Sequence, residues 1–152
     1  MKKISKHISY KEAVGSNYAK QYGIKNKPNE EQVENMKLLA EKVFEPLREW
    51  VGEPIKVNSM FRSKELNSAI KGAPRSSHLN GEAFDITSMG GKSNLEMFHW
   101  IKDNLVFDQL IWEFGEEPKW LHVSYKKEDN RQQILVTKRP GVYHIYSNCK
   151  TC

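Results

Sequence analysis

The sequence lacks the features that mark several special classes of protein. No apolar run approaches the length that a helix needs to cross a bilayer. The basic start, residues 1–7, is not followed by the apolar core of a signal peptide. Internal repeats and low-complexity linkers are also absent. We therefore expect no secretion signal, no stable membrane insertion and a chain made in the cytoplasm.

Cysteine is scarce, and its position limits what it can do. Cys149 and Cys152 form one C-x-x-C pair at the extreme C-terminus. A structural zinc ribbon normally needs two such pairs, and a thioredoxin-like motif lies at a helix start inside a fold. We interpret the pair as a frayed tail or an adventitious disulfide, with a local redox or metal role as the alternative.

The composition is that of an ordinary globular domain. The chain has 152 residues, of which 38% are hydrophobic and 28% charged, so we expect a single domain over 1–152. The net charge of +5 could serve nucleic acid, an anionic membrane or acidic polymers. The most basic stretch, residues 2–6, is short and has no interleaved aromatic residues for base stacking. We expect a solvated basic surface and no nucleic-acid partner. The oligomeric state is left open by the sequence, and a monomer is the default expectation.

Capping residues and apolar spacing predict three helices, and alternation predicts five strands. The expected helices are 30–50, capped by Asn29 and kinked or ended near Pro46; 63–70, closed by Gly72; and 93–105. The expected strands are 55–60, 82–87, 108–114, 120–125 and 133–138. Because short connections join adjacent strands, these elements favour an α+β fold with a mainly antiparallel sheet and helices packed on one side.

Two histidines and an aspartate stand out as candidate metal ligands. His78 precedes the strand 82–87, and Asp85 lies within it, on the face opposite Phe84. A second histidine, His122, lies in the strand 120–125. Three protein ligands with a fourth position open to water are the pattern of a catalytic zinc site. Taken alone, such residues often only complete a surface or a buried hydrogen bond.

The spacing of these residues carries a family resemblance. The pattern S-x-H-x-x-G-x-A-x-D in residues 76–85, followed by W-x-H-V-S in 120–124, resembles the zinc D-alanyl-D-alanine peptidases. That family includes wall carboxypeptidases, dipeptidases and bacteriophage endolysins, and it is structurally related to the hedgehog signalling domain. The resemblance covers about Ile55 to Tyr125 and implies a hedgehog/D,D-peptidase-like fold. It also implies Zn2+ held by His78, Asp85 and His122.

The small residues of the motif also have physical interpretations. Gly81 either allows a turn or close approach between the His78 loop and the strand, or merely begins the strand. Ala83 shares the face of Asp85, where a large side chain would fill the space that a substrate needs.

Peptide hydrolysis at zinc also needs a general acid/base. Wall peptidases of this kind often place a glutamate three residues before the last histidine, but that position is Lys119 here. The nearest substitute is Glu113, which a turn through 115–118 would bring beside the strand of His122. The hedgehog-like branch has a glutamate in a similar place. We therefore predict Glu113 as the general acid/base, with the turn residues Glu116 and Glu117 as competitors.

Arg62 and Ser76 are candidate substrate-binding residues. Arg62 lies in a Ser-x-x-Arg-Ser segment, residues 59–63, that resembles the family. There the arginine helps to hold the substrate and polarise its carbonyl, which suits the paired hydrogen bonds of a guanidinium; a surface ion pair is the alternative. Ser76 either contacts the peptide or orders the loop of His78, and Trp120 either walls the groove or packs inside.

The resemblance implies a zinc metallopeptidase that hydrolyses peptidoglycan stem peptides as a D-Ala-D-Ala carboxypeptidase or endopeptidase, with no separate wall-binding domain. Small size and basic charge suit a phage endolysin, which reaches the cell wall through a pore made by another protein. Two rivals remain: a non-catalytic zinc-bearing binding module of hedgehog-like fold, and a nucleic-acid-binding protein. The cleaved bond, the wall chemotype and the origin stay open. The other histidines lack a ligand partner at suitable spacing and are expected to be structural or exposed: His7, His99 and His144.

Overall fold

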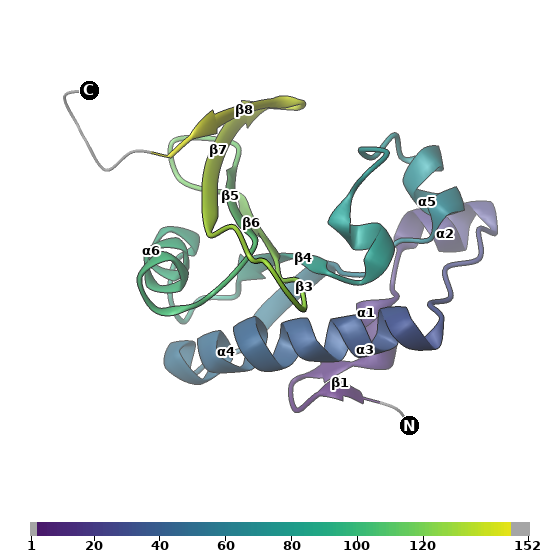
Figure 1. Cartoon of the computed structure of the whole chain (residues 1–152), viewed down its shortest axis with the longest axis horizontal. Coiled ribbons are helices and arrows are strands. Elements are labelled where there is room, and N and C mark those ends of the chain that lie inside the picture. The colour runs from purple at the N-terminus through teal and green to yellow at the C-terminus, as the bar shows by residue number, and fades with distance from the viewer. Residues whose placement is uncertain (1–2, 147–152) are drawn as a thin grey trace.

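The computed structural model describes residues 3–146, so the C-terminal cysteine pair lies outside the described residues. Helices occupy the first part of this range and most strands the second (Figure 1). The strands are β1 Lys3–Ser5, β2 Ile8–Ser9, β3 Ile55–Ser59, β4 Ala83–Ser88, β5 Gln109–Glu113, β6 Trp120–Ser124, β7 Gln133–Arg139 and β8 Val142–Ile145. The helices are α1 Tyr10–Ala13, α2 Asn17–Tyr22, α3 Glu30–Leu39, the π-helical η1 Ala40–Phe44, α4 Glu45–Val51, α5 Lys64–Ala69, the 3-10 helix η2 Ser77–Asn80 and α6 Asn94–Asn104.

The larger sheet has six strands in the order β3-β4-β6-β5-β7-β8. Every neighbouring pair is antiparallel except β5 and β7, which run parallel. The short strands β1 and β2 form a separate antiparallel pair. The prediction of an α+β fold with a mainly antiparallel sheet is confirmed.

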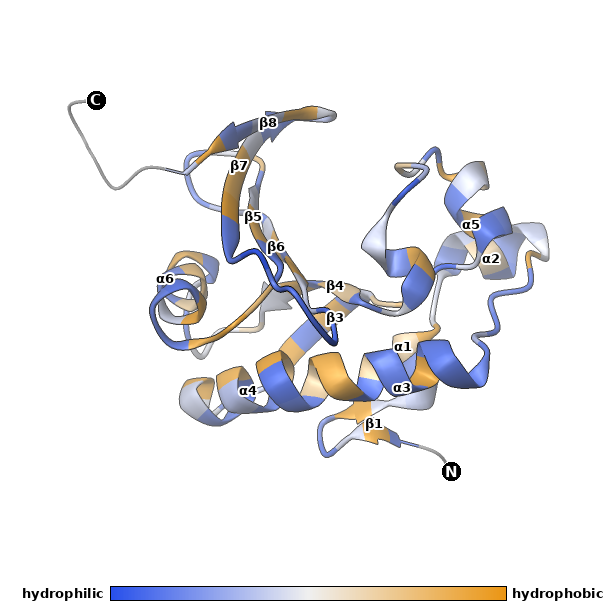
Figure 2. Ribbon diagram, in the orientation of Figure 1, coloured by the Kyte–Doolittle hydropathy of each residue, from blue (hydrophilic) through white to orange (hydrophobic). Residues whose placement is uncertain are grey.

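The apolar core lies on one face of this sheet. Phe84 of β4 meets Phe44 edge-on, with ring centroids 5.8 Å apart, and Phe98 of α6 meets Trp112 of β5 at 5.3 Å. The segment from η1 to α4 and helix α6 thus cover the same face, and Figure 2 shows hydrophobic stretches alternating with hydrophilic ones along them. Because side chains alternate along a strand, the opposite face carries the polar residues of β4 and β6.

The long helical segment does not end at Pro46, which corrects part of the prediction. The π-helical residues Ala40–Phe44 directly precede the proline, and α4 continues to Val51. A proline ring clashes with the carbonyl four residues earlier in a regular helix and has no N–H to donate. The wider π turn, with bonds five residues apart, accommodates that conflict without breaking the segment.

The predicted helix starts are confirmed by their caps. The side chains of Asn29, Ser63 and Ser93 each accept a hydrogen bond from a backbone N–H of the first turn. The end of α5 differs from the prediction, because Lys71, with φ 59°, takes the left-handed conformation next to Gly72. At position 72 the lack of space, and not the backbone conformation, favours glycine, since a Cβ there would lie 2.1 Å from Asn67 Oδ1.

Six elements of the described residues were not predicted: β1, β2, α1, α2, the 3-10 helix η2 and strand β8. Across residues 3–146, no helix combines the length and apolar character needed to traverse a bilayer.

Candidate metal centre

Asp85 and His122 lie directly opposite each other on adjacent strands of the sheet. They are register partners in the antiparallel pair β4–β6, on the face opposite the core. His122 Nδ1 lies 3.0 Å from Asp85 Oδ1, so the two side chains are within hydrogen-bond distance. Strand register therefore places two of the three predicted ligands side by side.

The third predicted ligand, His78, is carried by η2 and held from several sides. The side-chain amides of Gln32 and Asn35 in α3 donate to the backbone carbonyls of Leu79 and Asn80, at 3.0 and 2.9 Å. The N–H of Arg62 donates to the carbonyl of His78 itself at 3.1 Å. These bonds anchor η2 to helix α3 and to the end of β3, so the position of the imidazole is determined by the fold.

The orientation of the His78 ring leaves one nitrogen for a metal. Its Nδ1 lies 2.7 Å from the carbonyl oxygen of Met60, which can only accept, so Nδ1 carries the proton and donates. Burial lowers the pKa of His78, whose side chain is 1% exposed, and this favours the neutral ring. Its Nε2 then presents a lone pair and is a buried nitrogen without a hydrogen bond.

These groups fit a cation. His78 Nε2 lies 3.3 Å from Asp85 Oδ2, so two acceptors face each other. Burial raises the pKa of Asp85, but the two histidines outweigh it and hold that pKa well below its usual range, which leaves the carboxylate ionised. The three ligand atoms lie within 4.8 Å of one another, a spacing that suits one shared ion. A backbone carbonyl behind a metal-binding histidine is also the usual support for such a ligand.

Glu113 lies on the same face of the sheet as Asp85 and His122. Its register partner on β6 is Trp120, two residues from His122, so alternation brings the three side chains to one side. Burial raises the pKa of Glu113, and the nearby charge of Asp85 raises it further. The competing Glu116 and Glu117 are exposed in the turn between β5 and β6.

Arg62 and Ser76 contact each other next to the predicted metal ligands. Arg62 Nη2 donates to Ser76 Oγ at 3.3 Å, and that oxygen also accepts from the N–H of His78 at 3.2 Å. Burial lowers the pKa of Arg62, while Asp85 and Glu113 raise it. The Nε of Arg62 is buried without a hydrogen-bond partner. The structure thus places the Arg62 guanidinium near Asp85 and Glu113, with its Nε–H group free to donate a hydrogen bond to a ligand.

All six predicted site residues line one cleft of about 720 Å³. One wall is formed by segment 70–77, and the other includes the β7–β8 hairpin. The β7–β8 hairpin contributes Leu135 and Tyr143 to the cleft, which was not predicted. The dipeptide Pro140-Gly141 was a signal for the turn of the hairpin, but not for its place beside the cleft.

The remaining histidines lie away from the cleft lining. His7 pairs with Glu45 at 2.6 Å, and His99 packs against Phe98 and Tyr146. Neither belongs to a group of potential metal ligands within residues 3–146.

The comparison with protein families agrees with this geometry. The model of the family described as Peptidase M15 matches residues 6–124. The chain belongs to the peptidase M15 family. As an M15 peptidase it is a metal-dependent hydrolase, and its group of His78, Asp85 and His122 can bind a metal. The match ends at the last residue of β6, before the β7–β8 hairpin. No curated protein matches the chain.

Proposed function

We propose that this M15 peptidase is a zinc enzyme that hydrolyses the stem peptides of peptidoglycan, as a D-Ala-D-Ala carboxypeptidase or endopeptidase. The observation that carries the proposal is one cleft in which three metal-binding side chains adjoin a carboxylate and an arginine. The motif spacing in residues 76–85 supports the choice of substrate, because it resembles the D-alanyl-D-alanine peptidases. A phage endolysin is one setting for such an activity, and the basic charge suits an acidic wall.

The metal ligands would be His78 through Nε2, Asp85 and His122. A zinc ion bound there would supply a Lewis acid for the scissile carbonyl and lower the pKa of a water in its open position.

Glu113 acts as the general acid/base of the proposed reaction. Its carboxylate accepts a proton from the attacking water and then delivers that proton to the leaving amine. A raised pKa suits this work, because it brings the protonated and ionised forms of the carboxyl group closer in energy near neutral pH.

Arg62 holds the substrate on the other side of the metal ligands. A guanidinium binds a carboxylate or carbonyl oxygen of the peptide through several N–H groups, and the unpartnered Nε is available for such a bond. Ser76 orients the Arg62 guanidinium by accepting a hydrogen bond from Nη2, and it also orders the start of η2 by accepting one from the N–H of His78.

The test is hydrolysis of purified peptidoglycan and of stem peptides ending in D-Ala-D-Ala by the chain stripped with a chelator and reloaded with zinc. Mass spectrometry of the released fragments identifies the cleaved bond. We expect activity that depends on zinc. A zinc-loaded protein that cleaves no wall fragment would instead be a binding module, and a protein that binds no zinc would contradict the proposed cofactor.

A pair of glutamine variants assigns the acid/base. Glu113→Gln should retain zinc and lose about 10²- to 10⁴-fold in turnover, the usual contribution of a positioned acid/base. Glu116→Gln is the matched control, because it changes an exposed glutamate of the neighbouring turn and should leave turnover unchanged. Full activity of Glu113→Gln would assign the role to another group.

A further inference from the structure

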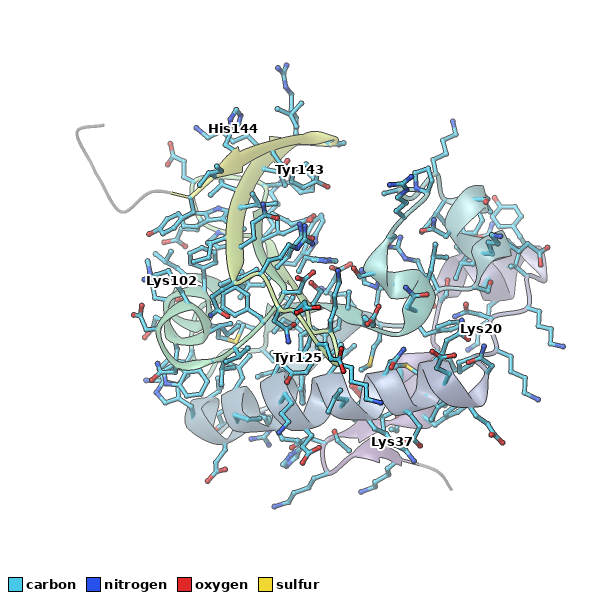
Figure 3. The ribbon with its side chains drawn as sticks, viewed as in Figure 1. Lys20, Lys37, Lys102, Tyr125, Tyr143 and His144 are labelled. Carbon is cyan, nitrogen blue, oxygen red and sulfur yellow. The ribbon has the colours of Figure 1, made fainter. Side chains whose placement is uncertain are left out.

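The β7–β8 hairpin brings a tyrosine to the cleft. Tyr143 of β8 pairs with Thr137 of β7, and Thr137 pairs with Glu113 of β5, so the three residues form one row across the sheet. Alternation puts Tyr143 on the cleft face, and Figure 3 shows it and His144 on opposite sides of β8. Thr137, between the other two, is 1% exposed. The row from Glu113 to Tyr143 therefore lies on one face of the sheet, with Thr137 buried between the two.

The two walls of the cleft differ in chemistry. Arg62 and Ser76 belong to the wall near segment 70–77, whereas Glu113 lies on the side of the hairpin. In Figure 1 the hairpin and the segment before η2 lie on opposite sides of β4 and β6. Since the acid/base protonates the leaving amine, the amine half of the substrate must lie toward Glu113 and the hairpin.

The distance from Glu113 to Tyr143 across the sheet matches the length of a short peptide. Tyr143 lies two strands from Glu113, or roughly 10 Å at the usual strand spacing. An extended peptide covers that distance in about three residues, and the tyrosine ring spans part of it. The phenol can therefore contact the first residues after the scissile bond.

The Tyr143 side chain is available for such a contact. It is 51% exposed, so its hydroxyl can meet a ligand. Burial of the remainder raises the pKa of Tyr143, and the charges of Glu113 and Asp85 raise it further. The phenol stays protonated at neutral pH and can donate a hydrogen bond to a peptide oxygen.

We propose that the β7–β8 hairpin forms the leaving-group wall of the cleft, and that the Tyr143 hydroxyl donates a hydrogen bond to a carbonyl or carboxylate oxygen of the leaving group. This inference rests on the proposed function, but the hairpin lies outside the part of the chain that matches the family. It makes Tyr143 a specificity-determining residue of this chain.

The test compares Tyr143→Phe with wild type on two stem peptides, one with a free C-terminal carboxylate and one with the same residue amidated. The phenylalanine keeps the ring and removes only the donor. We expect KM to rise about two- to tenfold on the amide, and more than about tenfold on the free carboxylate if that charged group is the acceptor, with kcat nearly unchanged. Equal effects on both peptides would indicate a backbone carbonyl as the acceptor, as in an endopeptidase.

His144→Ala is the matched control, because His144 lies on the same strand and faces away from the cleft. Its KM should match that of the wild type. If Tyr143→Phe and Tyr143→Ala both stay within twofold of wild type on both peptides, the inference is wrong, although hydrolysis by the wild type would still support the proposed function.

If no hydrolysis is detected, calorimetric titration tests the Tyr143 contact separately from the proposed hydrolytic function. The same peptides are titrated into Glu113→Gln and into Glu113→Gln combined with Tyr143→Phe. Weaker binding by the double variant supports the hairpin contact even if no variant hydrolyses peptide. Equal binding, or no binding by either protein, overturns the inference.

Discussion

Replacement of Gly81 by alanine should destabilise the fold more than the same change at a comparable glycine. Gly81 ends η2 with φ 73°, a left-handed conformation that costs an L-residue about 1–2 kcal/mol. An added Cβ would also lie 2.5 Å from the carbonyl oxygen of Gln32 and 3.0 Å from Met36 Cγ. Backbone of helix α3 cannot move aside cheaply, so overpacking should add about 1–3 kcal/mol. The expected loss in the free energy of unfolding is about 2–5 kcal/mol.

Gly52 provides the matched control for this change. It ends α4 with φ 75°, and a Cβ there would meet nothing within 4 Å. Gly52→Ala should therefore show only the conformational cost, about 1–2 kcal/mol. Urea unfolding of both variants in chelator measures the difference without a contribution from bound metal.

The metal affinity of the same two proteins gives a second measurement. Displacement of η2 by Gly81→Ala moves His78, so zinc affinity in a competition assay should fall, whereas Gly52→Ala should leave it unchanged. If the two variants lose the same stability within about 0.5 kcal/mol, the close approach to α3 does not constrain this position.

Two further changes test the ion pair of Asp108 and the role of Arg62. Asp108 is fully buried, and its carboxylate accepts from the Arg131 side chain at 3.0 and 2.8 Å. Burial raises the pKa of Asp108 but the bonds from Arg131 lower it more, so its stabilisation is present above the ordinary pKa near ~4 and is lost as pH falls through the folded value. Asp108→Asn should cost about 2–4 kcal/mol at pH ~7 and flatten the acid dependence in urea titrations, and an unchanged slope would contradict this assignment. Arg62→Lys keeps the charge but loses the fork, so KM should rise about tenfold in steady-state assays; an unaltered KM would show that the guanidinium does not bind substrate.

The parts of the structure that could be predicted are those specified by local sequence. Helix starts at Asn29, Ser63 and Ser93 follow from side chains that satisfy the first backbone N–H groups, an interaction over three residues. Strand alternation likewise predicted the faces of Asp85 and Glu113. Both predictions depend only on residues that lie within a few positions of one another in the sequence.

Features that depend on distant contacts were missed. The strand β8 pairs with β7, which in turn pairs in parallel with β5 more than 20 residues earlier, and no local pattern specifies that partner. Tyr143 could not be assigned to the cleft without this order. The continuation of α4 past Pro46 has a similar cause, because tertiary packing of Phe44 and Leu47 in the core outweighs the helix-breaking tendency of proline.

The bond from His78 to the Met60 carbonyl has a consequence for the exchange of metals. Because this bond orients the imidazole without help from an ion, we expect the position of His78 to be the same with and without bound metal. We expect metal to bind without a folding step, unlike in zinc fingers, where metal and fold form together. A spectroscopically visible ion such as cobalt should therefore bind the folded protein at the proposed zinc site, where its absorption spectrum would report the ligands.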